Sequence, residues 1–142
     1  MVGKSKRILP TKNYCCIIEN RAVDGKEIAK MKIVSWNVNG LEACRGKGFL
    51  KFIKETKPDI VCCQETKVSS KFQITIPGYT QIWNHGIRPG YSGTLVLTMR
   101  EPLSHSLGFG IEKFDIEGRL ITLEFEEYYV LNIYAPSIHE NN

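Results

Sequence analysis

Residues 31–41, MKIVSWNVNGL, constrain the fold of this chain more than any other segment. The first half is rich in β-forming residues and carries little charge, so it predicts a strand that runs into the core. Asn37, Asn39 and Gly40 follow, and these are poor strand residues. Two amides at the carboxyl end of a strand predict polar groups at a sheet edge where ligands of α/β proteins bind. From this segment alone, a strand running into a simple Asn-Gly turn is an equally good interpretation.

A second strand of the same kind follows. Residues 59–67, DIVCCQETK, contain a short apolar run of the buried-strand type, which breaks into polar residues that include Glu65. Between the two strands, residues 46–56 place their apolar side chains on one face and predict a helix, which Pro58 ends. Strand, helix and strand predict a βαβ unit whose carboxyl edge carries a site, with Glu65 as its carboxylate. Carboxylate oxygens are ligands that Mg²⁺ prefers.

The rest of the chain is rich in predicted strands. Residues 79–83 and 93–99 predict two, and residues 103–111 predict another that glycine interrupts. Residues 119–125 and 129–134 have the spacing of a hairpin and predict an antiparallel pair. The predicted fold class is therefore α/β, with a mixed β-sheet and flanking helices.

The composition of the chain fits one globular domain. It has 142 residues, of which 42% are hydrophobic and 24% are charged. The net charge of +4 arises entirely in residues 1–30, so charge is no evidence that the rest of the chain binds nucleic acid. Five cysteines without ligand-like spacing predict free thiols in a reducing, intracellular compartment. No apolar run reaches the length of a membrane span.

Residues 1–30 have no clear apolar period and contain Pro10. They predict a disordered leader whose deletion leaves the thermal midpoint nearly unchanged. Two alternatives stay open. Met31 is the true start in one of them, with an upstream extension before it, and the leader binds nucleic acid in the other.

The motif WNVNGL followed by QETK resembles the exonuclease III type of AP endonuclease, in the endonuclease/exonuclease/phosphatase superfamily. Three later segments fit in the same order: GYSGTLVLT (90–98), FDIEGRLITLEF (114–125) and NIYAP (132–136). The resemblance covers only the amino-terminal half of such an enzyme, so residues 31–142 are expected to be a domain truncated at its carboxyl end. It implies about half of a four-layer, DNase I-like α/β sandwich. Such a half would supply about one sheet and expose the face that should meet the second.

The resemblance also implies an activity. Such an enzyme carries out magnesium-dependent hydrolysis of the phosphodiester 5′ to an abasic site and 3′-to-5′ exonuclease action on duplex DNA, in base-excision repair. Mg²⁺ is the expected cofactor, with Mn²⁺ as a substitute, and double-stranded DNA with abasic sites or 3′ ends is the expected partner. The expected location is cytoplasmic in a prokaryote or nuclear in a eukaryote, without a membrane. GYSG and EGR favour this branch over a phosphatase that acts on small phosphoesters.

Five residues take roles at the reaction centre through the resemblance. Glu65 is the expected magnesium carboxylate, and Asn37 is expected at the metal and the attacking water. Tyr134 is expected to reach the scissile phosphate. Asn39 and Lys67 are expected to support this centre. Taken singly, each has a plainer interpretation, such as a surface glutamate, a solvated lysine or an aromatic residue at a strand end.

A second group is expected at the DNA backbone: Gly90, Tyr91, Ser92 and Ser137. Glycine allows a close approach of the phosphate backbone. Ser137 stands where many relatives have an asparagine, and its hydroxyl donates over a shorter reach. The resemblance gives Glu117 and Arg119, in EGR, a structural and backbone-orienting role.

Much of the family's chemistry has no counterpart here. Its catalytic Asp-and-Asn pair and its Ser-Asp-His lie beyond the position of Tyr134, and the three histidines of this chain match no catalytic position. We therefore expect the isolated chain to be inactive, with a polypeptide that supplies the missing carboxyl-terminal half as a further partner. The alternative from a different class is an inactive half-domain that binds DNA or a partner.

Overall fold

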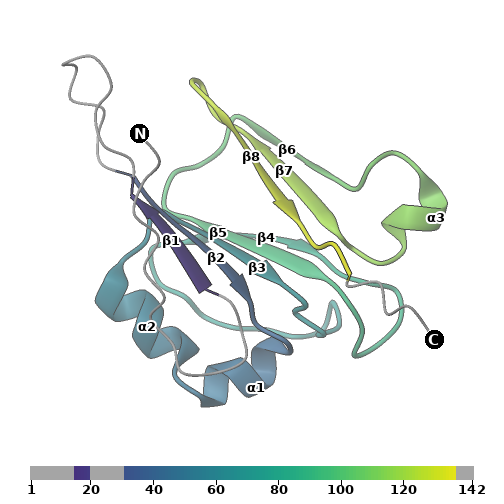
Figure 1. Ribbon diagram of the computed structural model, residues 1–142, viewed down its shortest axis with the longest axis horizontal. Helices are drawn as coiled ribbons and strands as arrows, with labels where there is room; N and C mark the ends of the chain where they lie inside the picture. Colours follow the sequence, from purple (N-terminus) through teal and green to yellow (C-terminus); the bar gives the residue numbers. More distant parts are fainter. Residues whose placement is uncertain (1–14, 20–30, 137–142) are drawn as a thin grey trace, which may run out of the picture.

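The computed structural model describes residues 15–19 and 31–136. In this part of the chain the elements form three layers, which Figure 1 shows one above the other. Two helices form the first layer, a five-stranded sheet (sheet A) the second, and a three-stranded sheet (sheet B) the third. Sheet A combines parallel and antiparallel strand pairs, as the sequence predicted.

Sheet A has the strand order β1-β2-β3-β5-β4. Its strands are Cys15–Glu19 (β1), Lys32–Asn37 (β2), Ile60–Gln64 (β3), Thr80–Asn84 (β4) and Thr94–Thr98 (β5). Strands β2 and β3 are parallel, and the other pairs are antiparallel. The four strands predicted from the sequence within this sheet are therefore confirmed.

Strand β1 differs from the prediction of a disordered leader. It pairs along its whole length with β2, with Ile17 opposite Val34. Its sequence, CCIIE, is a short β-forming run that satisfies hydrogen-bonding groups along the edge of β2. The other residues of the leader lie outside the described part of the chain.

Helices Leu41–Gly46 (α1) and Phe49–Thr56 (α2) connect β2 to β3 and cover one face of sheet A. The predicted helix corresponds to α2. Its apolar side chains Phe49 and Phe52 pack against Trp36 of β2, with ring centroids 5.4 and 5.0 Å away. The helix begins after Gly48 in a left-handed conformation and ends at Lys57, immediately before Pro58.

Sheet B covers the opposite face of sheet A. Its strands are Ser104–Leu107 (β6), Leu120–Glu124 (β7) and Tyr129–Ile133 (β8), all antiparallel, and a short helix, Glu112–Asp115 (α3), precedes β7. The predicted hairpin is β7–β8. The expectation of about one sheet with an uncovered face is wrong, because alternate apolar residues of β7 and β8 face sheet A. The core between the sheets includes Ile60 and Val96 from sheet A, and Ile121, Leu123 and Val130 from sheet B.

A buried asparagine joins the two sheets. Asn132 of β8 is 1% exposed, and its Nδ2 donates to the carbonyl oxygens of Cys63 and Leu95, each at 3.0 Å. Its Oδ1 accepts a hydrogen bond from Gln64 Nε2 at 2.8 Å. This side chain therefore fixes how β8 lies across β3 and β5.

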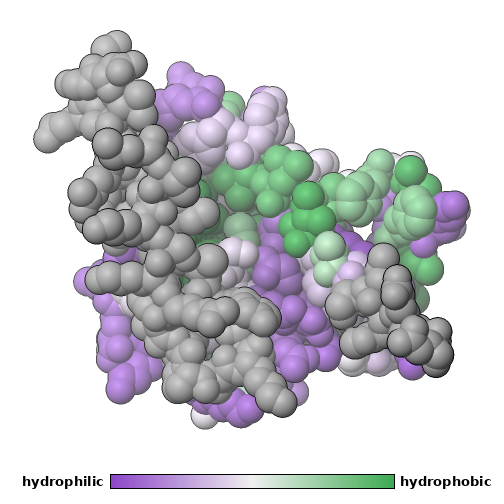
Figure 2. Space-filling view, in the orientation of Figure 1, coloured by the Kyte–Doolittle hydropathy of each residue, from purple (hydrophilic) through white to green (hydrophobic). Residues whose placement is uncertain are grey.

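The outer face of sheet B is apolar and exposed. Tyr129, Leu131 and Ile133 alternate along β8 with buried residues and are 62%, 55% and 49% exposed. Figure 2 shows hydrophobic side chains gathered over this part of the molecule. The longest described helix, α2, has eight residues, and no helix in the described ranges has the length and apolarity to cross a membrane.

Candidate active site

The parallel register of β2 and β3 brings the first two predicted site residues together. Asn37 lies opposite Gln64, so both strands end at the same edge of sheet A. Glu65 follows directly, and Asn37 Nδ2 donates to Glu65 Oε1 at 2.7 Å. The predicted placement of Asn37 and Glu65 at one edge is therefore what the structure shows.

Asn39 and Lys67 close this group into a network. The amide oxygen of Asn37 accepts a hydrogen bond from the backbone N–H of Asn39 at 3.0 Å. Lys67 Nζ donates to Asn39 Oδ1 at 2.6 Å and forms an ion pair with Glu65 Oε2 at 3.1 Å. Both ends of the Asn37 amide are therefore occupied, so this side chain orients the carboxylate of Glu65.

The backbone at this edge is strained. Asn39, Glu65 and Lys67 have φ values of 45°, 55° and 53°, in the left-handed region that non-glycine residues rarely adopt. Backbone hydrogen bonds from Gly40 N to Glu65 O (2.8 Å) and from Lys67 N to Ser92 O (2.9 Å) hold these turns in place. Such strain persists where the surrounding structure over-determines it, which is common at functional sites.

Tyr134 comes to the same network from sheet B. It follows β8, and its backbone N–H donates to Arg119 O at 2.8 Å. The guanidinium of Arg119 pairs with Glu117 and lies 4.7 Å from the centroid of the Tyr134 ring. The Tyr134 hydroxyl and the Glu65 carboxylate interact, and each shifts the pKa of the other. The guanidinium of Arg119 thus links Glu117 to Tyr134, and the structural and backbone-orienting role expected for EGR stays a prediction.

The electrostatics of the network keep its two ends in different protonation states. Burial alone would raise the pKa of Glu65, but hydrogen bonds from Asn37, Lys67 and Tyr134 outweigh it and lower this pKa below its ordinary value. Burial and the neighbouring Glu65 raise the pKa of Tyr134 above its ordinary value. At neutral pH the site therefore presents an ionised carboxylate beside a phenol that retains its proton.

The GYSG loop lies next to this network but exposes only part of itself. Gly90 is exposed and Tyr91 is 40% exposed, so both are accessible from solvent. Ser92, in contrast, is 2% exposed, and its hydroxyl is buried without a hydrogen-bond partner. The structure therefore leaves Gly90 and Tyr91 as the accessible residues of this predicted DNA-binding loop.

The remaining predicted or excluded residues fall outside the network. Ser137 and His139 lie outside the described residues. His85 stacks on Trp83 with ring centroids 5.1 Å apart, and its Nδ1 lies 3.2 Å from the carbonyl oxygen of Val68. His105 is exposed on β6. Neither of the described histidines contacts Glu65 through a hydrogen bond or ion pair.

Sequence analysis missed Asn132 and its partner Gln64. Together they hold the end of β3, and with it Glu65, against the strand that carries Tyr134. One signal was available, because Asn132 is a polar residue at an inward position of the otherwise apolar run YVLNIY.

Known proteins are similar to this chain in sequence and in fold. The endonuclease/exonuclease/phosphatase family matches residues 34–141 of the chain. The chain belongs to this family. The resemblance drawn from its five motifs is thereby confirmed.

Relatives within the family are nucleases that act on DNA. An exodeoxyribonuclease of Bacillus subtilis (strain 168) is 46% identical over 109 residues, which are 75% of this chain and 43% of that protein. A DNA-(apurinic or apyrimidinic site) endonuclease of Dictyostelium discoideum is 37% identical over 131 residues, which are 89% of this chain and 36% of that protein. The chain thus spans less than half the length of either relative.

Solved structures of the family agree with the fold. An AP endonuclease from Archaeoglobus fulgidus superposes with a TM-score of 0.63 at 34% identity, over 75% of this chain and 41% of that one. A 3′ phosphatase from Neisseria, bound to a product DNA hairpin, gives a TM-score of 0.64 at 27% identity, over 73% of this chain and 41% of that one. The predicted fold, a part of a DNase I-like α/β sandwich, is confirmed.

Nucleases of this family generally depend on a divalent metal ion, and the donor chemistry of the network suits one. Glu65 offers carboxylate oxygens, the ligand type that Mg²⁺ prefers. In the described ranges, however, no three His, Cys, Asp or Glu side chains gather into a group that could hold a metal. Glu65 is the single carboxylate of this network, and Lys67 already neutralises it. The described residues therefore supply one carboxylate ligand of a magnesium site, and the described ranges do not supply a second.

Proposed function

We propose that this chain is the amino-terminal part of an exonuclease III-type DNA-repair nuclease. Such an enzyme hydrolyses the phosphodiester 5′ to an abasic site and removes nucleotides from 3′ ends of duplex DNA, in base-excision repair. The observation that carries the proposal is the network of Asn37, Glu65 and Tyr134, in which an ionised carboxylate meets a protonated phenol at one edge of two sheets. The names of the relatives support DNA as the substrate.

Each residue of the network has a role in this proposal. Glu65 would hold Mg²⁺, or Mn²⁺ in its place, and Asn37 keeps its carboxylate oriented toward the cation. A bound divalent cation supplies positive charge at the phosphate and lowers the pKa of a bound water. Tyr134, whose raised pKa keeps the phenol protonated, would turn its O–H from Glu65 to a phosphate oxygen when the substrate binds. Asn39 holds Lys67 beside the carboxylate.

The role of Glu65 is tested by metal titration. We expect Glu65→Gln to abolish the Mg²⁺ binding that calorimetry detects on the full chain, because the substitution keeps the shape of the side chain and removes its charge. Glu55→Gln is the matched control, since this exposed carboxylate of α2 pairs with Lys51 away from the network. Equal Mg²⁺ binding by wild-type protein and Glu65→Gln would overturn the assignment.

We further propose that the 142-residue chain alone does not cleave DNA at a measurable rate. The described network has no second carboxylate or histidine to orient the attacking water or to stabilise the developing charge. Loss of one positioned electrostatic donor costs about 10²- to 10³-fold in rate, and loss of general-base help costs about 10²- to 10⁴-fold.

A polypeptide that carries the rest of the domain is the proposed partner. The chain covers 43% of the Bacillus relative, and the exposed apolar residues Tyr129, Leu131 and Ile133 of β8 form a surface for a further layer. The alternative function is a half-domain that binds DNA or a partner without cleaving DNA. The same exposed surface of β8 supports this alternative.

One assay separates these functions. A duplex with one abasic analogue is incubated with Mg²⁺ and the chain, with and without the carboxyl-terminal part of the Bacillus relative. We expect cleavage only in the combined sample, and we expect Glu65→Gln to remove it. Cleavage by the chain alone would contradict the proposed inactivity. Binding of DNA without cleavage in the combined sample would favour the half-domain.

A further inference from the structure

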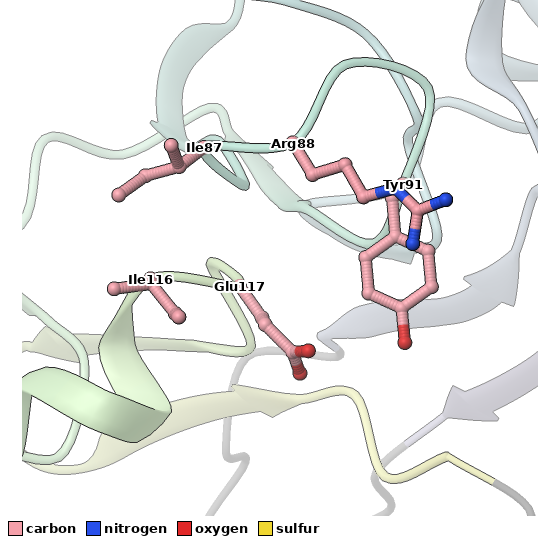
Figure 3. Close-up of a pocket in the computed structure, with 5 residues that line it drawn as sticks. All are labelled: Ile87, Arg88, Tyr91, Ile116 and Glu117. Atoms are coloured by element: carbon pink, nitrogen blue, oxygen red, sulfur yellow. The ribbon is translucent and has the colours of Figure 1, made fainter.

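A cavity of about 310 Å³ opens beside the candidate active site. Its lining residues are Ile87, Arg88, Tyr91, Ile116 and Glu117. Figure 3 shows that they come from two chain segments that face each other across the opening, the loop after β4 and the turn between α3 and β7.

The two walls of the cavity are joined by hydrogen bonds. The backbone N–H of Ile87 donates to Ile116 O at 2.8 Å, and that of Gly93 donates to Glu117 O at 3.1 Å. The hydroxyl of Thr94 donates to Gly118 O at 2.9 Å. Gly118 has a φ of 63°, and a Cβ there would collide with the backbone of β4. The cavity is therefore formed in the free protein and held by backbone contacts on both sides.

The charges around the cavity are unequal. The carboxylate of Glu117 is neutralised by Arg119, whose side chain is largely buried. In the described part of the chain, no carboxylate lies within ion-pair distance of Arg88. Its guanidinium instead lies 5.3 Å from the centroid of the Tyr91 ring, which holds it at the opening, as Figure 3 shows. Arg88 is therefore an oriented cation available to an anion.

Apolar surface lies next to this cation. Ile87 is 77% exposed and Ile116 is 44% exposed, and both line the cavity. A ligand that satisfies Arg88 and these isoleucines together has an anionic group attached to an apolar ring or chain. A nucleotide unit of DNA has this chemistry, with a phosphate beside the carbon face of a deoxyribose.

We propose that this cavity binds one sugar–phosphate unit of the DNA strand, with Arg88 donating to the phosphate and Ile87 and Ile116 packing against the deoxyribose. The proposal rests on the proposed function. Glu117 links the lining of the cavity to the candidate active site, since its carboxylate pairs with Arg119, whose guanidinium lies 4.7 Å from the centroid of the Tyr134 ring. In this proposal, a strand whose phosphate contacts Tyr134 places a neighbouring nucleotide at Arg88.

The salt dependence of DNA binding tests the role of Arg88. The full chain is titrated without Mg²⁺ against a fluorescent duplex that contains an abasic analogue, over a series of salt concentrations. We expect Arg88→Gln to weaken binding about fivefold to tenfold at low salt and to reduce the slope of log K against log salt by about 0.9, the value for one phosphate contact. Arg88→Lys should restore the slope.

Two matched variants complete this test. Arg100→Gln removes another exposed cation, located after β5 at the end of the strand away from the cavity, and should leave the slope unchanged. Ile87→Ser should weaken binding at every salt concentration without a change of slope, since it removes apolar contact and no charge. A wild-type slope in Arg88→Gln would overturn the proposal and leave DNA binding by the chain intact.

A small probe separates this proposal from the proposed function. Deoxyribose 5-phosphate is titrated into labelled protein, and the NMR signals of Arg88 Nε and of the Ile87 and Ile116 methyl groups are followed. We expect all three to shift in wild-type protein, and the methyl shifts to be lost in Arg88→Gln. Shifts without any binding of duplex DNA would contradict the proposed function and support the cavity. Absence of these shifts would overturn the cavity assignment.

Discussion

Sheet A and sheet B are built from the same kinds of residues but are covered differently. Helices α1 and α2 cover one face of sheet A and sheet B covers the other, so every residue of β5 is buried. Sheet B has one buried face. Along β8, Val130 and Asn132 are buried, whereas Leu131 between them is 55% exposed.

This difference shows how unevenly stability is distributed in the molecule. Burial of apolar area is the main source of folding free energy, and sheet A gains it on two faces. Sheet B gains it on one face and depends on sheet A for that face. We therefore expect sheet B to open locally at a lower free energy than sheet A. An exposed apolar face is also where a further layer of a domain would pack.

The largest effect that would separate the two sheets is expected from their core residues. Phe49 is fully buried between α2 and sheet A, so Phe49→Ala should lower the free energy of unfolding by about 3–5 kcal/mol. Leu131→Ala, on the outer face of sheet B, should change it by less than about 0.5 kcal/mol. Urea unfolding followed by circular dichroism measures both. Similar losses would show that the outer face of sheet B is covered in solution.

The next effect concerns the asparagine that joins the sheets. In Asn132→Ala the carbonyl oxygens of Cys63 and Leu95 and the amide of Gln64 lose a buried partner, which should cost about 2–3 kcal/mol. Asn84→Ala is the matched control, since Asn84 also crosses between the sheets but makes one such bond, to Leu120 O at 2.8 Å. Its loss should be smaller in the same urea experiment. The reverse order would contradict the role given to Asn132.

Thiol labelling would sharpen the comparison without destabilising either sheet. Burial raises the pKa of Cys44, on the buried face of α1, to about 11 despite the opposing effect of Lys47. Burial also raises the pKa of Cys62, between the sheets, to about 12. Both thiols stay protonated in the folded protein near pH 8, so labelling requires opening. Peptide-resolved mass spectrometry should find Cys62 labelled about tenfold faster than Cys44. Equal rates would mean that the sheets open as one unit.

These raised pKa values also predict a pH dependence of stability. A raised pKa in the folded state stabilises below the unfolded value and is lost as pH rises through the folded value. The contributions of Cys44 and Cys62 should therefore be complete below about pH 8.5 and lost as the pH approaches 11 to 12. Urea unfolding across this range measures it, with Cys62→Ala expected to flatten the decline.

The smallest effect concerns the edge of sheet A. The sequence predicted that deletion of residues 1–30 leaves the thermal midpoint nearly unchanged. The pairing of β1 with β2 now predicts a fall of more than ~5 °C, which corresponds to about 1 kcal/mol in a domain of this size. Calorimetry of the shortened chain decides between the two. An unchanged midpoint would show that sheet A does not need its outer strand.

The sequence predicted those parts of the site that depend on local pattern. Two buried strands joined by a helix are parallel, and parallel strands end at one edge, so Asn37 and Glu65 were placed together correctly. The link from Lys67 to Asn39 depends on a left-handed backbone conformation at both residues. Neither position is a glycine, so the residue types did not indicate this conformation. Asn132 depends on which strands of the two sheets cross, and that choice is made by packing across the whole core.

Two other features, the cavity and strand β1, could not be predicted from the sequence for related reasons. The cavity is formed by segments about thirty residues apart, Ile87 and Glu117 among them, and their contact follows from the antiparallel pairing of β4 with β5 and the return of the chain through sheet B. Strand β1 is a run of four apolar residues without alternation, too short to assign to a strand by period alone.

The position of β8 at the end of the described chain also bears on how the protein is made. All strands of sheet A have been synthesised once Thr98 is reached, whereas Asn132 and Tyr134 emerge later. Because chains fold progressively from the amino terminus during translation, sheet A and its helices are available before the strand that completes the site. A nascent chain that has reached Glu124 already holds Asn37 and Glu65 but does not yet contain Tyr134. The pairing of Tyr134 with the edge that carries Asn37 and Glu65 therefore forms only after β8 has emerged, and ribosome stalling before β8 would yield a chain without it.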